Sequence, residues 1–265
     1  MNAPNIIHYC WFGSGELSEA ARITLASWEK YAPGFEIRCC DENVLDVNCC
    51  EWTRKAYAAK KYAFVADYAR FKMLYEFGGV YMDLGSELVK DITPLVNTRS
   101  PFSAIEELSK TATTGLIAAT PPHNPVVASV LKKYETSDFS DDPDFLRANT
   151  VNEMFTSELE KIGFVREDKL QKVGEWTLLP SSYFNPVYGF GGYHIKKDTY
   201  SIHHYSASWT EPKLKVKKRI VNRLTPFLGR RVTQVLGRVV GEVYQEGLVL
   251  GLKNCMDLAR QKKSN

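Results

Sequence analysis

Two adjacent glycines, Gly78 and Gly79, separate a helical pattern from a strand pattern, and this junction constrains the fold of the 265-residue chain most strongly. Before it, apolar residues recur at helical spacing within residues 60–77, which predicts a helix with an apolar stripe. After it, residues 80–82 form a short β-prone run that ends at Asp83. Ligands of open parallel sheets bind beyond the carboxyl ends of the strands, so Asp83 is a candidate site residue.

The first forty residues also alternate between strand and helix patterns. Residues 5–11 are apolar and β-prone, residues 17–31 repeat at helical spacing, and residues 35–39 alternate. The order strand, helix, strand favours an α/β fold with a parallel sheet. Further along the chain we expect strands at residues 115–119 and 201–205 and a helix at residues 125–134.

Composition is that of a soluble globular protein, with 44% hydrophobic and 25% charged residues. No apolar run approaches the ~18 residues that a membrane-spanning helix needs. The first residues carry neither a basic region nor an apolar signal stretch, so we expect a cytoplasmic protein.

The six cysteines include two adjacent pairs, Cys39-Cys40 and Cys49-Cys50. Structural zinc ligands are usually separated by two to four residues, which adjacent cysteines do not match. We therefore predict free thiols, with a metal site or disulfides as the alternatives.

Charge is distributed unevenly along the chain. Residues 213–265 hold thirteen Lys/Arg and three Asp/Glu, a charge of +10, so the remainder carries −7 against a total of +3. Composition changes from Pro212 onward, which predicts a main domain of residues 1–212 and a basic helical appendage of residues 213–265. A stripe of apolar residues at helical spacing lies in this appendage, at Val232, Val235, Leu236, Val239, Val240 and Val243.

The apolar stripe of the appendage would dock on the main domain, form a dimer or lie on an anionic membrane surface. Nucleic acid is the usual alternative partner for a basic run. We do not expect it, because the basic run lacks interleaved aromatic residues and the rest of the chain is acidic.

Asp67 and Arg70 are three residues apart and therefore share one face of the predicted helix. A diphosphate leaving group needs cationic or metal neutralisation, and sugar hydroxyls need hydrogen-bond acceptors. Asp67, Arg70 and Asp83, brought together by the glycine junction, would supply these groups. The alternative is an ordinary surface ion pair beside an aspartate at a strand end.

The segment from Ala63 to Asp83 resembles the signature of family 32 glycosyltransferases, an Ala-x-x-Ser/Ala-Asp-x-x-Arg helix followed by Gly-Gly-x-Tyr-x-Asp-x-Asp. That family includes bacterial capsular-polysaccharide synthesis proteins and yeast initiating mannosyltransferases, and the glycosyltransferase domain of the large glucosylating toxins is similar. Residues 6–13 resemble its first strand and base-contacting loop. Residues 183–186 and 202–209 resemble a tail motif of the capsular group.

This resemblance implies a GT-A fold, a Rossmann-like α/β domain that binds a nucleotide sugar. It also implies roles for individual residues: Asp67 and Arg70 at the sugar hydroxyls; Tyr81 at the ribose or sugar; Asp83 at the ribose and a divalent metal; Trp11 and Phe12 at the nucleotide base; His204, or alternatively His203, as a metal ligand; and Ser208 and Trp209 at the diphosphate.

One position departs from the family pattern, because Gly85 stands where the second aspartate of Asp-x-Asp is expected. Glu87 would replace that aspartate from the same strand end, since side chains two apart share a face. Alternatively, Asp83, His204 and the diphosphate hold the metal, or metal binding is weak or activity lost. Oxygen ligands suit Mg²⁺ or Mn²⁺, and an imidazole favours Mn²⁺.

The activity implied by the resemblance is retaining transfer of a hexose, most simply from a UDP-sugar, during bacterial capsular or exopolysaccharide synthesis. The acceptor would be a glycan or a polyprenyl-linked oligosaccharide, bound near Thr113, Thr114 and the loop of residues 141–144. A nucleotide-sugar-binding protein without transfer activity is the alternative. A nucleotidyltransferase is a weaker one, because residues 13–15 are too slight for a glycine-rich phosphate loop.

Overall fold

The structure of this protein is a computed structural model that describes residues 2–107, 109–184 and 195–204, with seven further positions between 232 and 243. The chain divides into two compact units, residues 1–185 with 196–203 and residues 186–195 with 204–265. All numbered helices and strands belong to the first unit. The predicted boundary at Pro212 lies outside the described residues, and the two-domain division stays a prediction.

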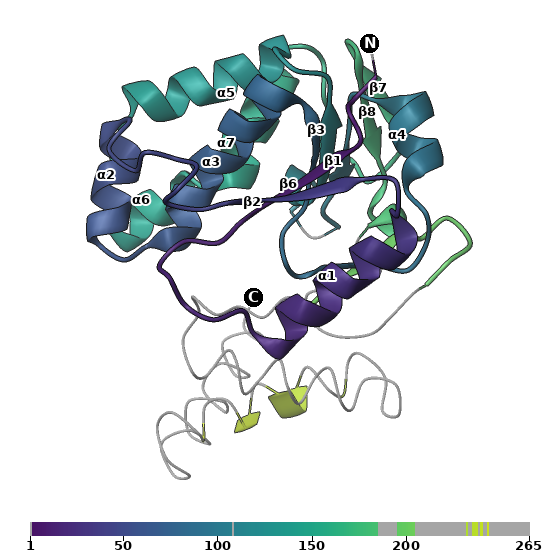
Figure 1. Cartoon of the computed structure of the whole chain (residues 1–265), viewed down its shortest axis with the longest axis horizontal. Coiled ribbons are helices and arrows are strands. Elements are labelled where there is room, and N and C mark those ends of the chain that lie inside the picture. The colour runs from purple at the N-terminus through teal and green to yellow at the C-terminus, as the bar shows by residue number, and fades with distance from the viewer. Residues whose placement is uncertain are drawn as a thin grey trace, which may run out of the picture. The chain divides into compact units, whose positions relative to one another are not determined.

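A seven-stranded mixed sheet in the order β2-β1-β3-β6-β5-β8-β7 forms the centre of the first unit (Figure 1). β1 runs parallel to β2 and β3, whereas β6 runs antiparallel to β3 and β5. The strands are β1 (Ile6–Cys10), β2 (Glu36–Cys40), β3 (Gly79–Tyr81), β5 (Phe102–Ile105), β6 (Ala112–Thr120), β7 (Gln171–Val173) and β8 (Trp176–Leu179). A second, two-stranded sheet pairs β4 (Ser86–Leu88) with β9 (Ser201–His203).

Helices pack on both faces of the large sheet (Figure 1). Tyr81 belongs to one core cluster, while its neighbours Val80 and Met82 belong to the other, as the alternation of a strand requires. The first cluster takes residues from α2 (Glu51–Ala58), α3 (Tyr62–Phe77), α5 (Pro125–Thr136) and α7 (Val151–Glu160). The second takes residues from α1 (Glu19–Tyr31) and α4 (Thr93–Arg99). Two short helices complete the set, α6 (Pro143–Ala148) and the 3₁₀ helix η1 (Ser181–Tyr183).

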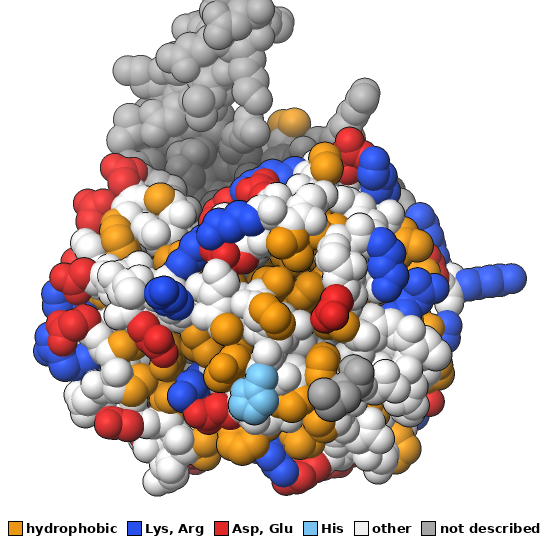
Figure 2. All heavy atoms as spheres, turned by 90° about the horizontal axis from the view of Figure 1, so that it is seen from above, with side chains coloured by type: hydrophobic (Ala, Val, Ile, Leu, Met, Phe, Trp, Pro, Cys, Tyr) orange, Lys and Arg blue, Asp and Glu red, His pale blue; other side chains and the backbone are white. Residues whose placement is uncertain are grey.

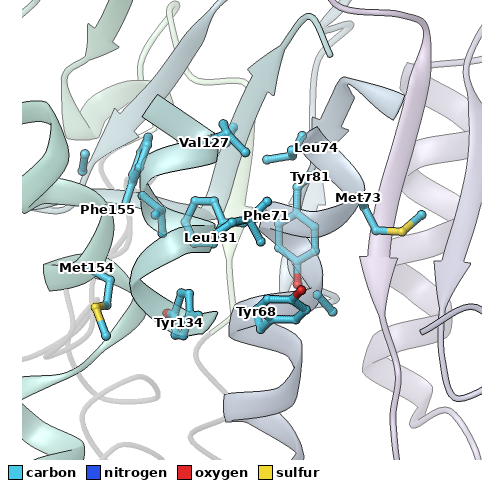
Figure 3. Close-up of a cluster of buried hydrophobic side chains, with 14 of the residues drawn as sticks. Tyr68, Phe71, Met73, Leu74, Tyr81, Val127, Leu131, Tyr134, Met154 and Phe155 are labelled. Atoms are coloured by element: carbon cyan, nitrogen blue, oxygen red, sulfur yellow. The ribbon is translucent and has the colours of Figure 1, made fainter. Parts of the chain in front are cut away.

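The first core cluster includes Tyr81, the last residue of β3. Figure 3 shows Tyr68 and Phe71 of α3 with Leu131 and Tyr134 of α5 and Tyr81 of β3 among its side chains. Fully burying a large apolar side chain contributes about 1.5–3 kcal/mol. This packing gives α3 and β3 fixed positions relative to each other.

The glycine junction between α3 and β3 is as the sequence predicts, and the structure shows why both glycines are needed. Gly78 and Gly79 have positive φ angles, 63° and 94°. A Cβ on Gly78 would lie 2.6 Å from the Pro122 nitrogen, and one on Gly79 would lie 2.7 Å from the Ile6 carbonyl oxygen. The chain therefore turns from helix to central strand in a space that admits no side chain.

The other predicted elements are present with small shifts of their bounds. The strand expected at residues 115–119 is the longer β6, and the helix expected at residues 125–134 is α5. The five described cysteines are free thiols.

No helix among the described residues has the length and apolar character needed to cross a membrane. The face in Figure 2 carries acidic and basic side chains interspersed with apolar ones.

The described positions of the C-terminal stripe are helical, as their spacing predicts. Val235 is 63% exposed and Val232 is 50% exposed. Docking, dimerisation and membrane contact of this stripe stay predictions.

Candidate active site

Arg70 lies at the centre of the candidate site and bridges two carboxylates. Its Nη2 is 2.8 Å from Asp67 Oδ1, and its Nη1 is 3.3 Å from Asp83 Oδ1. Arg70 is only 4% exposed and Asp67 only 8%. The alternative interpretation of Asp67 and Arg70 as a surface ion pair is therefore wrong, because α3 is packed on the face that carries them.

The guanidinium of Arg70 is held by further contacts. Its Nε donates to the Ala66 carbonyl at 3.2 Å, and its Nη1 lies 3.4 Å from Thr114 Oγ1. Its central carbon is 4.7 Å from the centre of the Tyr81 ring, a cation–π distance. These contacts fix the cation before any ligand binds.

Asp83 is the carboxylate of the site that solvent reaches. The Tyr81 hydroxyl donates to Asp83 Oδ1 at 2.9 Å, and the Asp83 amide donates to the Gly115 carbonyl at 3.1 Å. The Asp83 side chain is 37% exposed, against 11% for Asp67 and 5% for Arg70. A ligand that enters the site therefore meets Asp83, with Arg70 and Asp67 behind it.

Burial governs the ionisation of these groups. It raises the pKa of Asp67 to about 6, and the charge of Asp83 adds to that shift while Arg70 opposes it. Burial alone would lower the pKa of Arg70, but Asp83, Tyr81 and Asp67 outweigh it and the pKa is raised. Burial also raises the pKa of Tyr81, so its hydroxyl keeps its proton and donates to Asp83.

The loop after β1 carries the residues expected at the nucleotide base. Trp11 is half-buried, and its Nε1 donates to the Gly15 carbonyl at 2.6 Å. Phe12 is 8% exposed and packs in the first core cluster. The Gly13 amide donates to Glu42 Oε1 at 2.7 Å. The base-binding roles of Trp11 and Phe12 stay predictions.

The expectation that Glu87 replaces the missing metal ligand from the same strand end as Asp83 assumed one continuous strand, and that assumption is wrong. β3 ends at Tyr81, and the chain then turns, with the Ser86 amide donating to the Asp83 carbonyl at 2.8 Å. Glu87 lies in β4, where it pairs with Ile202 of β9. Asp83 and Glu87 thus belong to separate segments, because a turn replaces the continuous strand that the two-residue spacing assumed.

The histidines and the tail motif are only partly within the described residues. His203 pairs with Ser86 across the small sheet, and the exposed His204 follows it directly in the chain. Ser208 and Trp209 lie outside the described residues. Within the described part, no group of three or more His, Cys, Asp or Glu side chains is arranged to hold a metal ion.

Gly115 is a site residue that sequence reasoning missed. A Cβ at this position would lie 2.5 Å from Asp83 Oδ2. Thr114, expected near the acceptor, contacts Arg70, and its acceptor role stays a prediction. The available signal was the isolated glycine within a strand pattern, which often marks a bulge or a close approach.

Comparisons with known proteins give a family match and matches to solved structures. The profile of a family described as "Glycosyltransferase sugar-binding region containing DXD motif" matches residues 18–102, which include Asp67, Arg70, Tyr81 and Asp83. No curated protein matched the chain. Among solved structures, one titled "PaToxG Glycosyltransferase" superposes with a TM-score of 0.47 and 17% identity, covering 60% of this chain and 69% of that chain.

The family match runs from the start of α1 to the start of β5 and includes α3 and the end of β3, whose residues Asp67 and Asp83 lie on either side of the buried Arg70. Asp67, Arg70, Tyr81 and Asp83 are thus both within the matched region and close together in space, whereas Gly85 stands in place of the second aspartate of the motif. The chain thus carries, at residues 18–102, a glycosyltransferase sugar-binding region of the type that contains a DXD motif.

Proposed function

We propose that this glycosyltransferase uses a UDP-sugar and transfers the sugar with retention of configuration to a glycan or lipid-linked oligosaccharide in bacterial surface-polysaccharide synthesis. The observation that carries the donor assignment is Arg70, which is buried between Asp67 and the exposed Asp83. A preorganised cation between two carboxylates provides both donors and acceptors for a polyhydroxylated ligand.

Arg70 acts in this proposal mainly by orienting its neighbours. A guanidinium has five N–H groups, and hydrogen bonds to Ala66, Thr114 and Asp67 use three of them, while Nη1 also forms an ion pair with Asp83. The second N–H of Nη2 would donate to a sugar hydroxyl. Asp67, held by Arg70, would accept a hydrogen bond from a second hydroxyl.

Asp83 fits the protein side of a divalent cation site. Mg²⁺ is usually held by one or two carboxylates together with substrate phosphates rather than by a cage of protein ligands. The partly exposed Asp83 carboxylate would supply the protein ligand in such an arrangement. A bound Mg²⁺ or Mn²⁺ would neutralise charge on the leaving diphosphate.

Retention is proposed from the family resemblance. Because Asp67 is already paired with Arg70 and is poorly placed to act as a nucleophile, we propose front-face attack rather than double displacement. In the proposed step an acceptor hydroxyl attacks the anomeric carbon from the face that the diphosphate leaves, and the leaving oxygen takes the proton. Thr113, Thr114 and residues 141–144 would line the acceptor side, with His204, Ser208 and Trp209 near the diphosphate. The tail of residues 213–265 would bring the enzyme to an anionic membrane surface.

A donor panel tests the proposed function. Purified protein would be incubated with UDP- and GDP-sugars and Mn²⁺, and donor hydrolysis would be followed by release of the nucleoside diphosphate. We expect one UDP-sugar to be hydrolysed. Asp83→Ala should lower that rate by about 10²–10³-fold, as loss of one preorganised charge contact does elsewhere.

The fold should survive Asp83→Ala, because the side chain is partly exposed and Arg70 keeps Asp67. Circular dichroism of the variant checks this. The assignment of the site is refuted if Asp83→Ala hydrolyses the donor as fast as the wild type. The choice of donor is refuted if only GDP-sugars react.

A further inference from the structure

β6 contains a large bulge beside the candidate active site. Ser103 of β5 pairs with Ala118, but the next residue, Ala104, pairs with Thr113. The four residues 114–117 therefore have no partner on β5. The Ser103 hydroxyl lies 3.2 Å from the Thr113 carbonyl and 2.9 Å from the Ile117 carbonyl, so it closes the base of the bulge.

The bulge brings the backbone of Gly115 to the end of β3. The Gly115 carbonyl accepts hydrogen bonds from the Asp83 amide at 3.1 Å and from the Ser86 hydroxyl at 3.0 Å. On its Cα side, the glycine faces the Asp83 carboxylate, since an added Cβ would lie 2.5 Å from Oδ2 and 3.3 Å from Cγ. Gly115 thus accepts a hydrogen bond from the Asp83 amide, and its lack of a side chain leaves room for the Asp83 carboxylate.

Gly115 differs from Gly78 and Gly79 in its backbone conformation. Gly78 and Gly79 have positive φ angles, whereas Gly115 is not among the residues with a positive φ in the described part of the chain. Its backbone therefore suits any residue, and only the space occupied by Asp83 excludes a side chain. A substitution here acts on the carboxylate more directly than on the fold.

We propose that Gly115 is a positioning residue of the glycosyltransferase reaction, which sets the orientation of the Asp83 carboxylate. Oδ1 of Asp83 is fixed by the Tyr81 hydroxyl and Arg70, and Oδ2 lies against the Gly115 Cα. The role of Asp83 in donor binding rests on the proposed function, but its orientation by Gly115 does not. β-Bulges recur next to active sites, where they redirect side chains.

Gly115→Ala is the direct test. An ordinary contact of 3.4 Å would require Asp83 Oδ2 to move by about 1 Å from its 2.5 Å separation. A displacement of about 1 Å in an active site can lower the rate about 10²-fold. We expect that fall in donor hydrolysis. Gly34→Ala is the matched control, because its Cβ meets nothing within 4 Å and its φ is not positive, so its rate should equal that of the wild type.

A double-mutant cycle by urea unfolding separates positioning from a general loss of stability. Gly115→Ala is introduced into the wild type and into Asp83→Ala. With Asp83 truncated the added methyl has space, and loss of glycine's freedom in the unfolded chain should raise the unfolding midpoint. In the wild type the same substitution should raise it less or lower it.

The positioning role is refuted if Gly115→Ala hydrolyses the donor at the wild-type rate, or if it shifts the unfolding midpoint equally in both backgrounds. A wild type that hydrolyses no nucleotide sugar contradicts the proposed function instead. The unfolding cycle still decides the Gly115–Asp83 contact in that case.

Discussion

Asp67 is the residue at which stability and function should conflict most clearly. Its carboxylate is 8% exposed, and burial raises its pKa from 3.8 to about 6. Because the folded-state pKa is the higher one, the folded protein binds a proton more readily than the unfolded chain. The stability that this provides is fully present below pH 3.8 and is lost as pH rises through 6.

The size of the effect follows from the shift. Two pKa units correspond to about 3 kcal/mol, at 1.36 kcal/mol per unit. An asparagine at position 67 cannot ionise, but its side-chain oxygen can still accept a hydrogen bond from Arg70 Nη2. Arg70 keeps Asp83 as its charged partner through Nη1. We therefore expect the variant to be more stable than the wild type by up to about 3 kcal/mol at pH 8, and about equal to it near pH 4.

Thermal unfolding measures this difference. For a domain of this size 1 kcal/mol shifts Tm by about 2–4 °C, so the expected gain at pH 8 is roughly 6–12 °C. Glu175→Gln, at an exposed carboxylate, is the control and should change Tm little. Donor hydrolysis by Asp67→Asn should fall about 10–100-fold through loss of a charged acceptor.

Equal Tm values for Asp67→Asn and the wild type at both pH 4 and pH 8 would refute the reasoning. A gain in stability without loss of hydrolysis would retain the electrostatic argument and remove Asp67 from the site. Functional residues often lower stability in this way.

Two further predictions concern His8 and the tail. Burial lowers the pKa of His8 from 6.5 to about 4, so the stability that the neutral imidazole provides should be lost as pH falls from 6.5 through 4. Urea unfolding should therefore show a free energy of unfolding that decreases on the acid side. His8→Gln should reduce this decrease, and replacement of the exposed His123 should not. The full chain should sediment with anionic vesicles at low salt and be released at 1 M salt, where the screening length falls to about 3 Å. A chain ending at Pro212 should stay in the supernatant. Membrane contact is contradicted if the full chain does not sediment with anionic vesicles at low salt.

Local patterns predicted the parts of the fold that depend on local physics. The helix expected in residues 60–77 is present as α3, but its buried residues lie all round the helix rather than in the one apolar stripe that was predicted. The glycine junction and the strand after it follow from the conformational freedom of glycine and from the β-prone run. The three-residue spacing of Asp67 and Arg70 predicted a shared face, and the structure confirms that they form an ion pair.

Long-range packing accounts for what the sequence could not predict. The burial of Arg70, on helix α3, depends on Thr114 of β6 and Tyr81 of β3. The contact of Gly115 with Asp83 depends on the pairing of β5 with β6. Glu87 was misplaced because one hydrogen bond, from the Ser86 amide to the Asp83 carbonyl, turns the chain between two strands.

Glu42 connects the loop after β1 to helix α2 and restrains the loop. One carboxylate oxygen accepts from the Gly13 amide at 2.7 Å and from the hydroxyl of Tyr57, on α2, at 2.9 Å. Both hydrogen bonds go to a carboxylate, and such bonds are stronger than those between neutral groups. Movement of the loop would therefore have to break such a bond or carry α2 along with it. The loop after β1 is therefore held in place before any ligand binds.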